Sequence, residues 1–207
     1  MNKLIIIAQP SKKWFLWELA LEYKKQVEQL WDKVEILDLY DKKNFQPNLE
    51  FEDMKFLNKD KNRNIFQKKI SDSQELIFIF PIWWWNLPAI LKNFIDTNFS
   101  AGFAYKFQKG SVIPKKLLKW KTAKVYTSCD WFKYIYNNYL CPMYLKKYIE
   151  MYILWIFWIE LNEFKLYDKM RKRNKEEKKK ILEELRLDLK REKMTSWFRK
   201  IINNILN

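Results

Sequence analysis

The sequence contains no histidine, and this absence excludes several common kinds of active site. Without histidine there can be no Ser-His-Asp triad, no Cys-His nucleophile pair, no HExxH zinc site and no imidazole general base. The two cysteines, Cys129 and Cys141, cannot form a zinc cluster alone and do not indicate a disulfide framework. We therefore expect no metal site, and we expect a reducing, cytoplasmic environment.

Long apolar runs are also missing. The longest, Met151–Ile159, is too short to cross a bilayer, and Leu4–Ala8 is too short for the core of a signal peptide. The 207 residues are 48% apolar and 31% charged, which is typical of a soluble globular chain. A chain of this length buries enough surface to fold without a disulfide.

Glycine is scarce and tryptophan is abundant. Glycine occurs only at Gly102 and Gly110, where an average chain of this length would hold about 14, and tryptophan occurs 11 times. Glycine is the residue best suited to tight turns, because it lacks a Cβ. The chain must therefore make most of its turns without it.

Positive charge is in excess, with 40 Lys and Arg against 25 Asp and Glu, a formal charge of +15. The basic residues concentrate late, at Lys169–Arg173 and Lys178–Lys180. An anionic partner and a lysine-rich solvated surface both explain such an excess. No nucleic-acid binding motif accompanies it, so we expect no nucleic-acid partner.

Strand and helix patterns alternate along the chain. Continuous apolar runs predict strands buried on both faces, and apolar residues at a spacing near 3.6 predict helices. The alternation predicts an α/β fold with a parallel sheet covered on both faces. The predicted strands are Leu4–Ala8, Val34–Leu39, Leu76–Phe80, Thr122–Thr127 and Glu163–Tyr167. The predicted helices are Trp14–Leu30, Ile65–Ser73, Leu87–Phe99, Tyr134–Trp158 and Lys175–Arg191, with a second amphipathic segment at Trp197–Leu206 and a long loop at Asp41–Asn64.

Ligands of parallel α/β sheets bind outside the carboxyl ends of the strands. The residues that follow the predicted strands are therefore candidates, and three consecutive tryptophans, Trp83–Trp85, follow one of them. They could line a crevice in which a planar ligand stacks, or they could cap the sheet or form a dimer interface. The sequence leaves both readings open.

The segment Leu76–Phe107, with FPIWWWNLPAILKNFIDTNFSAGFAYKF as its core, resembles the flavodoxin-like NAD(P)H:quinone oxidoreductase family. The opening LIIIAQPSKKWFLWELA, the stretch VEILDLY and the closing FKLYDKMRKRNKEEKKKILEEL are also similar to the family pattern. The resemblance implies a flavodoxin-like three-layer sandwich with a five-stranded parallel sheet. It also implies bound FAD or FMN, NAD(P)H as cosubstrate, a quinone-like acceptor and a homodimer. We expect a flavin-binding domain over residues 1–191 and an amphipathic C-terminal extension over 192–207.

The same resemblance implies roles for individual residues. The loop that holds the flavin phosphate would be formed by Gln9, Trp14, Phe15 and Leu16. The isoalloxazine ring would lie along Pro81, Ile82, Trp83, Trp84 and Trp85, and the third flavin loop would be Thr127, Ser128, Cys129 and Asp130. The nicotinamide and quinone pocket would be bordered by Tyr105 and Phe107, with Tyr134 or Tyr136 near the flavin carbonyl.

This resemblance implies chemistry that suits a chain without histidine, because the flavin itself takes a hydride and passes on two electrons. The histidine that some family members use is absent. A different class of function is the alternative: a non-catalytic or regulatory subunit associated with a membrane transport protein. The basic region and the Trp197–Leu206 segment could contact an anionic membrane, although we expect this segment to pack on the domain.

Several tryptophans stand where such sequences tend to have glycine. They are Trp14, Trp31, Trp85, Trp120, Trp131 and Trp158, and Trp155 is a further candidate. Trp31, for example, follows the first predicted helix, at a C-cap position that favours glycine. Our hypothesis is that UGA codons that specify glycine were read as tryptophan. It explains both unusual counts, and a truly tryptophan-rich chain is the alternative.

Overall fold

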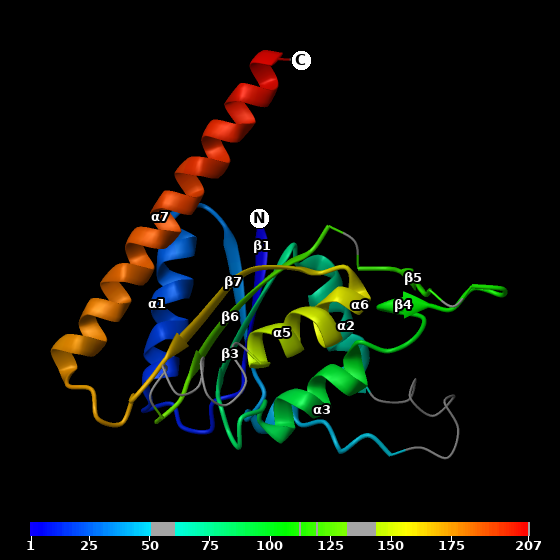
Figure 1. Cartoon of the computed structure of the whole chain (residues 1–207), viewed down its shortest axis with the longest axis horizontal. Helices are drawn as coiled ribbons and strands as arrows, with labels where there is room; N and C mark the ends of the chain where they lie inside the picture. Colours follow the sequence, from blue (N-terminus) through cyan, green and yellow to red (C-terminus); the bar gives the residue numbers. More distant parts are fainter. Residues whose placement is uncertain (51–60, 112, 119, 132–143, 207) are drawn as a thin grey trace.

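Five parallel strands form the central sheet of the computed structural model, which describes residues 1–50, 61–111, 113–118, 120–131 and 144–206 (Figure 1). The strands are β1 (Asn2–Ile7), β2 (Lys33–Asp38), β3 (Glu75–Pro81), β6 (Thr122–Ser128) and β7 (Glu160–Tyr167). Their order is β2-β1-β3-β6-β7, and each neighbouring pair is parallel. The predicted five-stranded parallel sheet is confirmed.

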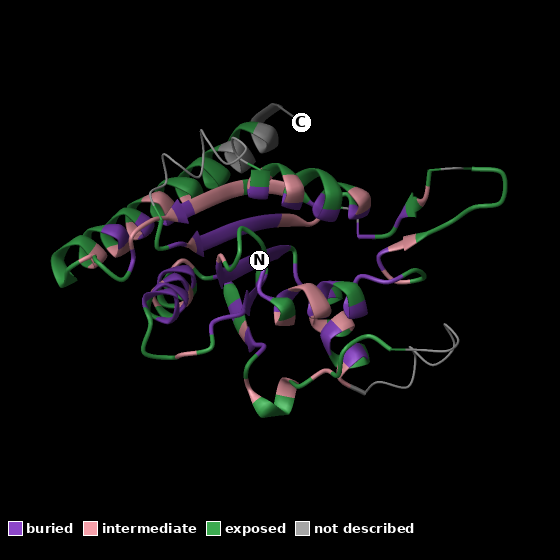
Figure 2. Cartoon of the chain, turned by 60° about the horizontal axis from the view of Figure 1, so that its bottom comes forward, coloured by how far each residue is buried: buried purple, intermediate pink, exposed green. Residues whose placement is uncertain are grey.

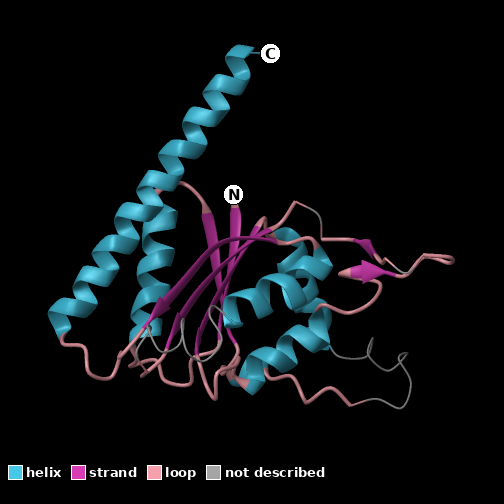
Figure 3. Ribbon diagram, in the orientation of Figure 1, coloured by secondary structure: helices cyan, strands magenta, loops and turns pink. Residues whose placement is uncertain are grey.

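Helices cover both faces of this sheet (Figures 1 and 3). On one face lie α1 (Phe15–Gln29) and α7 (Lys175–Leu206). On the other lie α2 (Lys61–Asp72), α3 (Ala89–Asn98), α5 (Tyr144–Lys147), the π-helical segment η3 (Tyr148–Leu154) and α6 (Trp155–Phe157). The chain therefore folds as three layers.

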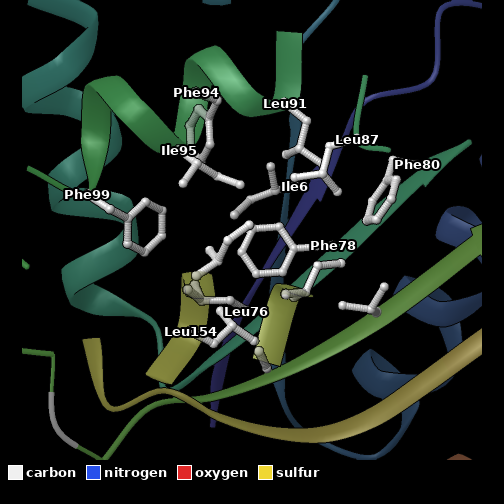
Figure 4. Close-up of a cluster of buried hydrophobic side chains, with 14 of the residues drawn as sticks. Ile6, Leu76, Phe78, Phe80, Leu87, Leu91, Phe94, Ile95, Phe99 and Leu154 are labelled. Atoms are coloured by element: carbon white, nitrogen blue, oxygen red, sulfur yellow. The ribbon is translucent and has the colours of Figure 1, made fainter. Parts of the chain in front are cut away.

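Alternate residues of the strands enter two separate cores. Ile5 and Ile7 of β1 face α1 and α7, whereas Leu4 and Ile6 face the other helical layer. Both faces of the sheet are therefore apolar, which is why the central strands read as continuous apolar runs. Figure 2 shows the central strands as buried, and Figure 4 shows the larger core, in which Phe78 lies among the side chains of β3 and α3.

The last helix, α7, is a single helix of 32 residues, so the two separate C-terminal segments that the sequence predicts are joined. Its first half packs on α1 through Ile181, Leu185 and Leu189, and its last part extends away from the body (Figure 1). Among the described residues, no helix combines the length and the apolar character that crossing a bilayer requires.

Some smaller elements differ from the prediction. A hairpin of β4 (Tyr105–Lys106) and β5 (Lys115–Lys116) was not predicted, and neither was the 3₁₀ turn η1 (Lys42–Asn44). Helix α2 begins at Lys61, inside the segment predicted as a loop. The first part of the predicted helix Tyr134–Trp158 lies outside the described residues, which resume at Tyr144.

A buried cluster of charged side chains lies at the amino end of the sheet. The Glu75 carboxylate contacts the Lys3 ammonium at 2.6 Å and the Lys124 ammonium at 3.9 Å, and all three side chains are buried. The Tyr23 hydroxyl donates to the same carboxylate at 3.3 Å. Burial, together with the charge of Glu75, raises the pKa of Tyr23 well above its ordinary value.

Candidate functional site

The loops that follow β1, β3 and β6 meet at the carboxyl edge of the sheet (Figure 3). The amide of Ile82, after β3, donates to the Ser128 carbonyl at 2.8 Å, and the amide of Cys129 donates to the Tyr167 carbonyl at 2.9 Å. The strand order reverses between β1 and β3, which is where doubly wound sheets bind ligands. The three predicted flavin loops are thus brought to one edge of the sheet.

The first loop carries a buried polar atom that lacks a partner. Gln9 is 2% exposed, and its Oε1 has no hydrogen-bond partner among the described residues. The Gln9 carbonyl accepts from the indole Nε1 of Trp17 at 3.2 Å, which fixes the backbone of the loop. A buried orphan acceptor is unfavourable unless a further group satisfies it, so Gln9 is a candidate contact for a bound ligand.

Helix α1 follows this loop. Its N-cap residue, Trp14, is exposed and makes no side-chain capping bond, so the helix end keeps backbone donors of the kind that bind phosphate. Phe15 and Leu16 are buried in the core, with the Phe15 ring 5.9 Å from the Tyr167 ring. Of the predicted phosphate residues, these two can therefore offer backbone amides only.

The second loop makes a tight turn immediately after β3. The amides of Trp83 and Asn86 each donate to the other's carbonyl, at 3.1 and 2.9 Å. Both central residues, Trp84 and Trp85, have positive φ, 48° and 59°, as in a type I′ turn. Pro81 is buried, Ile82 is half-buried and the three tryptophans are exposed, so the sheet-capping interpretation does not hold for their rings.

Most side chains of the third loop make contacts that stabilise the fold and do not line an open site. The Thr127 hydroxyl is buried and donates to the Phe80 carbonyl at 2.7 Å. The Cys129 thiol is buried in the larger core, and burial raises its pKa to about 11. Asp130 pairs with the Arg171 guanidinium at 2.8 Å. Ser128, half-buried, ends strand β6 and is held through its carbonyl by the second loop.

Two tryptophans bring the second and third loops into contact with each other. The ring centroids of Trp85 and Trp131 lie 6.0 Å apart, and Trp84 lies 6.5 Å from Trp85. Because these indoles take up space between the loops along which a flavin ring would lie, the chain as written fits the phosphate end of a flavin but not its ring. Gln9, which could contact the phosphate end, and Trp85, which obstructs the ring, both lie at the carboxyl edge of the sheet.

Two of the predicted acceptor-pocket residues, Tyr105 and Phe107, are not brought to this edge within one chain. Tyr105 and Phe107 contact each other edge to face at 5.5 Å, and Tyr105 stacks on Phe157 at 6.2 Å. The hairpin β4–β5 lies to the side of the molecule, beyond α6 (Figure 1). Tyr134 and Tyr136 lie outside the described residues.

Sequence reasoning missed two residues of the edge. Asn86 closes the tight turn, and its Oδ1 accepts from the Leu87 amide at 2.7 Å. Arg171 reaches Asp130 from the loop after β7, and no local sequence pattern marks this arginine for that contact. Asn86, five residues after the end of β3 and two before Pro88, is of a residue type that is common in turns, so it could have been found from that composition.

Comparison with known proteins agrees with this architecture. The chain is 32% identical over 121 residues to an uncharacterized NAD(P)H oxidoreductase of Haemophilus influenzae, a match that covers 55% of this chain and 57% of that protein. The chain spans about half the length of the curated relatives it matches.

Solved structures share the fold over most of both chains. Smu.1420 of Streptococcus mutans is 29% identical with a TM-score of 0.75, covering 90% of this chain and 97% of that one. An NAD(P)H:quinone oxidoreductase of Methanothermobacter marburgensis is 20% identical with a TM-score of 0.71, covering 90% and 95%. A family described by its flavodoxin-like fold matches residues 1–190, and the chain belongs to this family.

Proposed function

We propose that this protein is a flavin-dependent NAD(P)H oxidoreductase that passes two electrons to a quinone or a similar acceptor. The observation that carries the proposal is the carboxyl edge of the sheet, where the buried Gln9 Oε1 has no partner in the described part of the chain and lies close to the uncapped start of α1. The family, and the names of the relatives that share it, support the same reaction class.

The chain's own residues would hold the cofactor at three points. The backbone at Trp14, Phe15 and Leu16 would bind the phosphate of FAD or FMN, with Gln9 beside it. Once the indoles of Trp85 and Trp131 are removed, the segments Pro81–Trp85 and Thr127–Asp130 would lie along the ring. A bound flavin would supply hydride acceptance from NAD(P)H and two-electron delivery to the acceptor.

The acceptor pocket requires a second copy of the chain in this proposal. Because the hairpin β4–β5, which begins at Tyr105, lies away from the carboxyl edge of its own chain, Tyr105 and the neighbouring Phe107 would reach a pocket only as part of a homodimer. Tyr134 or Tyr136 would complete that pocket. We propose a cytoplasmic location, which is consistent with the reducing environment expected from the cysteines.

The test is flavin binding followed by turnover. Purified chain as written and the Trp85→Gly, Trp131→Gly double variant are titrated with FMN and with FAD, and bound flavin is measured by its visible absorbance. We expect the variant to bind one of them and to bleach when NAD(P)H is added, with reoxidation by a soluble quinone. Gln9→Leu in the variant background should weaken binding by about tenfold, the loss of one buried hydrogen bond.

Circular dichroism provides the control, because it shows whether each variant is folded. If both proteins are folded and neither binds flavin, the oxidoreductase proposal is refuted, and the regulatory-subunit alternative gains support. If flavin is bound and reduced but an azo compound is the better acceptor, the reaction class stands and the quinone is replaced.

A further inference from the structure

Left-handed backbone is concentrated at tryptophan in this protein. Among the described residues, the non-glycine positions with positive φ are Trp31, Trp84, Trp85, Trp120, Trp158 and Lys169. Bulky L-residues are genuine outliers in this region, because their Cβ approaches the neighbouring carbonyl. Five of the 11 tryptophans, all of which lie in the described part of the chain, adopt it, against a single Lys or Arg among the described residues, so the residue type and the conformation are linked.

Two of these tryptophans end helices in the way that glycine does. After α1, the Trp31 amide donates to the Glu28 carbonyl at 3.0 Å and the Asp32 amide to the Val27 carbonyl at 3.2 Å. This pair of bonds defines a Schellman motif whose left-handed C′ residue, here Trp31, is usually glycine.

The end of α6 repeats the same pair of bonds. The Trp158 amide donates to the Trp155 carbonyl at 3.0 Å, and the Ile159 amide donates to the Leu154 carbonyl at 3.1 Å. Trp158, with φ of 59°, is again the C′ residue. Two independent helix ends therefore place tryptophan where the backbone requires glycine.

Burial does not explain why tryptophan occupies these left-handed positions. Trp31 and Trp120 are each 93% exposed, so neither indole is held in place by a core that could offset a strained backbone. Trp120, with φ of 71°, lies two residues before the start of β6, and Trp85 is the second central residue of the tight turn. Trp158 is also largely exposed, although Lys116 lies 4.7 Å from its ring.

We propose that positions 31, 85, 120 and 158 are glycine in the working protein, encoded by UGA codons. The inference is independent of the enzymatic activity, because backbone conformation carries it. Glycine at 85 would also separate the second flavin loop from Trp131 and open the carboxyl edge. Trp84 shares the left-handed backbone but has the smallest φ of the group, 48°, and it is not among the candidates drawn from the sequence.

The other three positions of the hypothesis drawn from the sequence lack this support. Trp14 has φ of −94° and Trp155 has φ of −59°, values that any residue adopts. Trp131 is also absent from the residues with positive φ. The structure therefore narrows seven candidates to four.

The direct test is the peptide sequence of the protein isolated from its source, by mass spectrometry across the four positions. Glycine at all four confirms the proposal. Tryptophan at any of them, or UGG as its codon, overturns the proposal for that position.

Recombinant proteins test the physical argument separately. We expect glycine at 31, 85, 120 and 158 together to raise Tm by roughly 10 °C, through relief of four left-handed residues. The matched control places glycine at Trp14, Trp131, Trp155 and Trp197, which are similarly exposed but lack positive φ, and its Tm should not rise. Equal effects of the two sets would refute the backbone argument. Flavin binding and Tm are measured separately, so the Tm comparison can be interpreted even if the proteins bind no flavin.

A second, independent observation concerns the end of α7. Met194 is nine residues after Leu185, and Phe198 is nine residues after Leu189. Nine residues are about two and a half helical turns, so Met194 and Phe198 lie on the face opposite the one that packs on α1. Together with Trp197 and Ile202, they form an exposed apolar stripe, so the expected packing of this segment on the domain is not found for these residues.

Basic residues flank this stripe. Residues 190–207 contain five Lys and Arg and one Glu. The Glu192 carboxylate is engaged by the buried Lys124, and of the five cations Lys193 pairs with Asp32 at 2.7 Å and Arg191 with Asp188 at 3.7 Å. An apolar face with Trp and Phe beside positive charge is the pattern of a helix that lies in a membrane interface. We infer that the stripe Met194, Trp197, Phe198 and Ile202 binds an anionic bilayer surface. Charge complementarity favours this occupant over a second copy, which would bring two basic segments together.

The test is flotation of the full chain with lipid vesicles. We expect binding to vesicles of phosphatidylcholine mixed with phosphatidylglycerol, little binding to phosphatidylcholine alone, and loss of binding at high salt. The Trp197→Ser, Phe198→Ser variant should lose binding at least tenfold. The control variant Ile65→Ser, Tyr152→Ser, which removes exposed apolar side chains elsewhere, should keep it.

Sedimentation tests the alternative that a second copy of the chain covers the stripe. If the full chain does not float and the Trp197→Ser, Phe198→Ser variant has a smaller oligomeric state than the unchanged protein, the stripe is covered by a second copy and the membrane inference is overturned. Absence of both binding and self-association also overturns it.

Discussion

Replacing Glu75 by glutamine should destabilise the protein strongly, because this carboxylate neutralises two buried lysines. The Lys3 ammonium is 2.6 Å away and the Lys124 ammonium 3.9 Å away, in side chains that are 7% and 3% exposed. Glutamine has nearly the same shape as glutamate, so the change removes charge and leaves packing almost intact. Of the described carboxylates, Lys3 then keeps only Asp32, at 4.0 Å, whereas Lys124 keeps Glu163 and Glu192.

The magnitude follows from the burial of Lys3. Breaking a buried ion pair by removing one partner costs about 3–5 kcal/mol, and the remaining carboxylates around both lysines place this case near the lower value. A loss of about 3 kcal/mol is a large fraction of a typical free energy of unfolding. For a chain of this size it corresponds to a fall in Tm of roughly 6–12 °C.

Urea denaturation followed by circular dichroism measures the free energy of unfolding of each variant. Asp96→Asn is the matched control, because its pair with Lys92 at 2.6 Å lies on the surface and is worth about 0–1 kcal/mol. A loss below 1 kcal/mol for Glu75→Gln, equal to that of the control, would refute the reasoning. A double-mutant cycle with Lys3→Met should then show no coupling, whereas we expect a coupling of about 1–3 kcal/mol.

Four further predictions follow from individual side chains. In a Cys141→Ser background, the pKa of about 11 predicts that Cys129 is alkylated at pH 8 about 100-fold more slowly than a thiol of pKa 9.0. The same raised pKa predicts a stability contribution present below pH 9 and lost as the pH rises through 11, and a pH series of urea melts checks it. Burial favours a raised pKa for Asp32, but hydrogen bonds and charges that include the Lys193 ammonium at 2.7 Å lower this pKa overall. Lys193→Met should therefore reduce the free energy of unfolding above pH 4 and make the loss of stability in acid less steep. Arg63→Met should cost about 2 kcal/mol in urea melts, because the Arg63 guanidinium donates to the Ser100 hydroxyl and the Thr97 carbonyl; an unchanged midpoint would contradict this.

The strands could be predicted because of where they lie in the sheet. The central strands β1, β3 and β6 are buried on both faces, so their apolar runs mark them within two residues. The edge strand β7 is only partly buried, its apolar pattern is weaker, and it begins three residues before the predicted start at Glu163. The two-residue strands β4 and β5 are too short to carry a periodic pattern.

The positions of the site loops could also be predicted, but not the directions of their side chains. Thr127 and Cys129 share a strand face with Val125 and turn toward the interior, which depends on the register of β6 in the sheet. The contact between Trp85 and Trp131 joins loops far apart in the sequence, and no local pattern encodes it. The continuity of α7 through Thr195 and Ser196 was missed because two polar residues resemble a break, yet the segment has no proline or glycine to end it.

The distribution of indoles has a consequence for optical measurements on this protein. Ten of the 11 tryptophans are exposed, and Trp17 alone, at 7% exposure, is buried. Exposed indoles already emit at long wavelength in the native state, so the total fluorescence should shift little when the chain unfolds. The part of the emission that does shift belongs to Trp17, whose Nε1 donates a hydrogen bond to the Gln9 carbonyl at 3.2 Å. Its blue-edge emission should therefore act as a built-in reporter of the first loop.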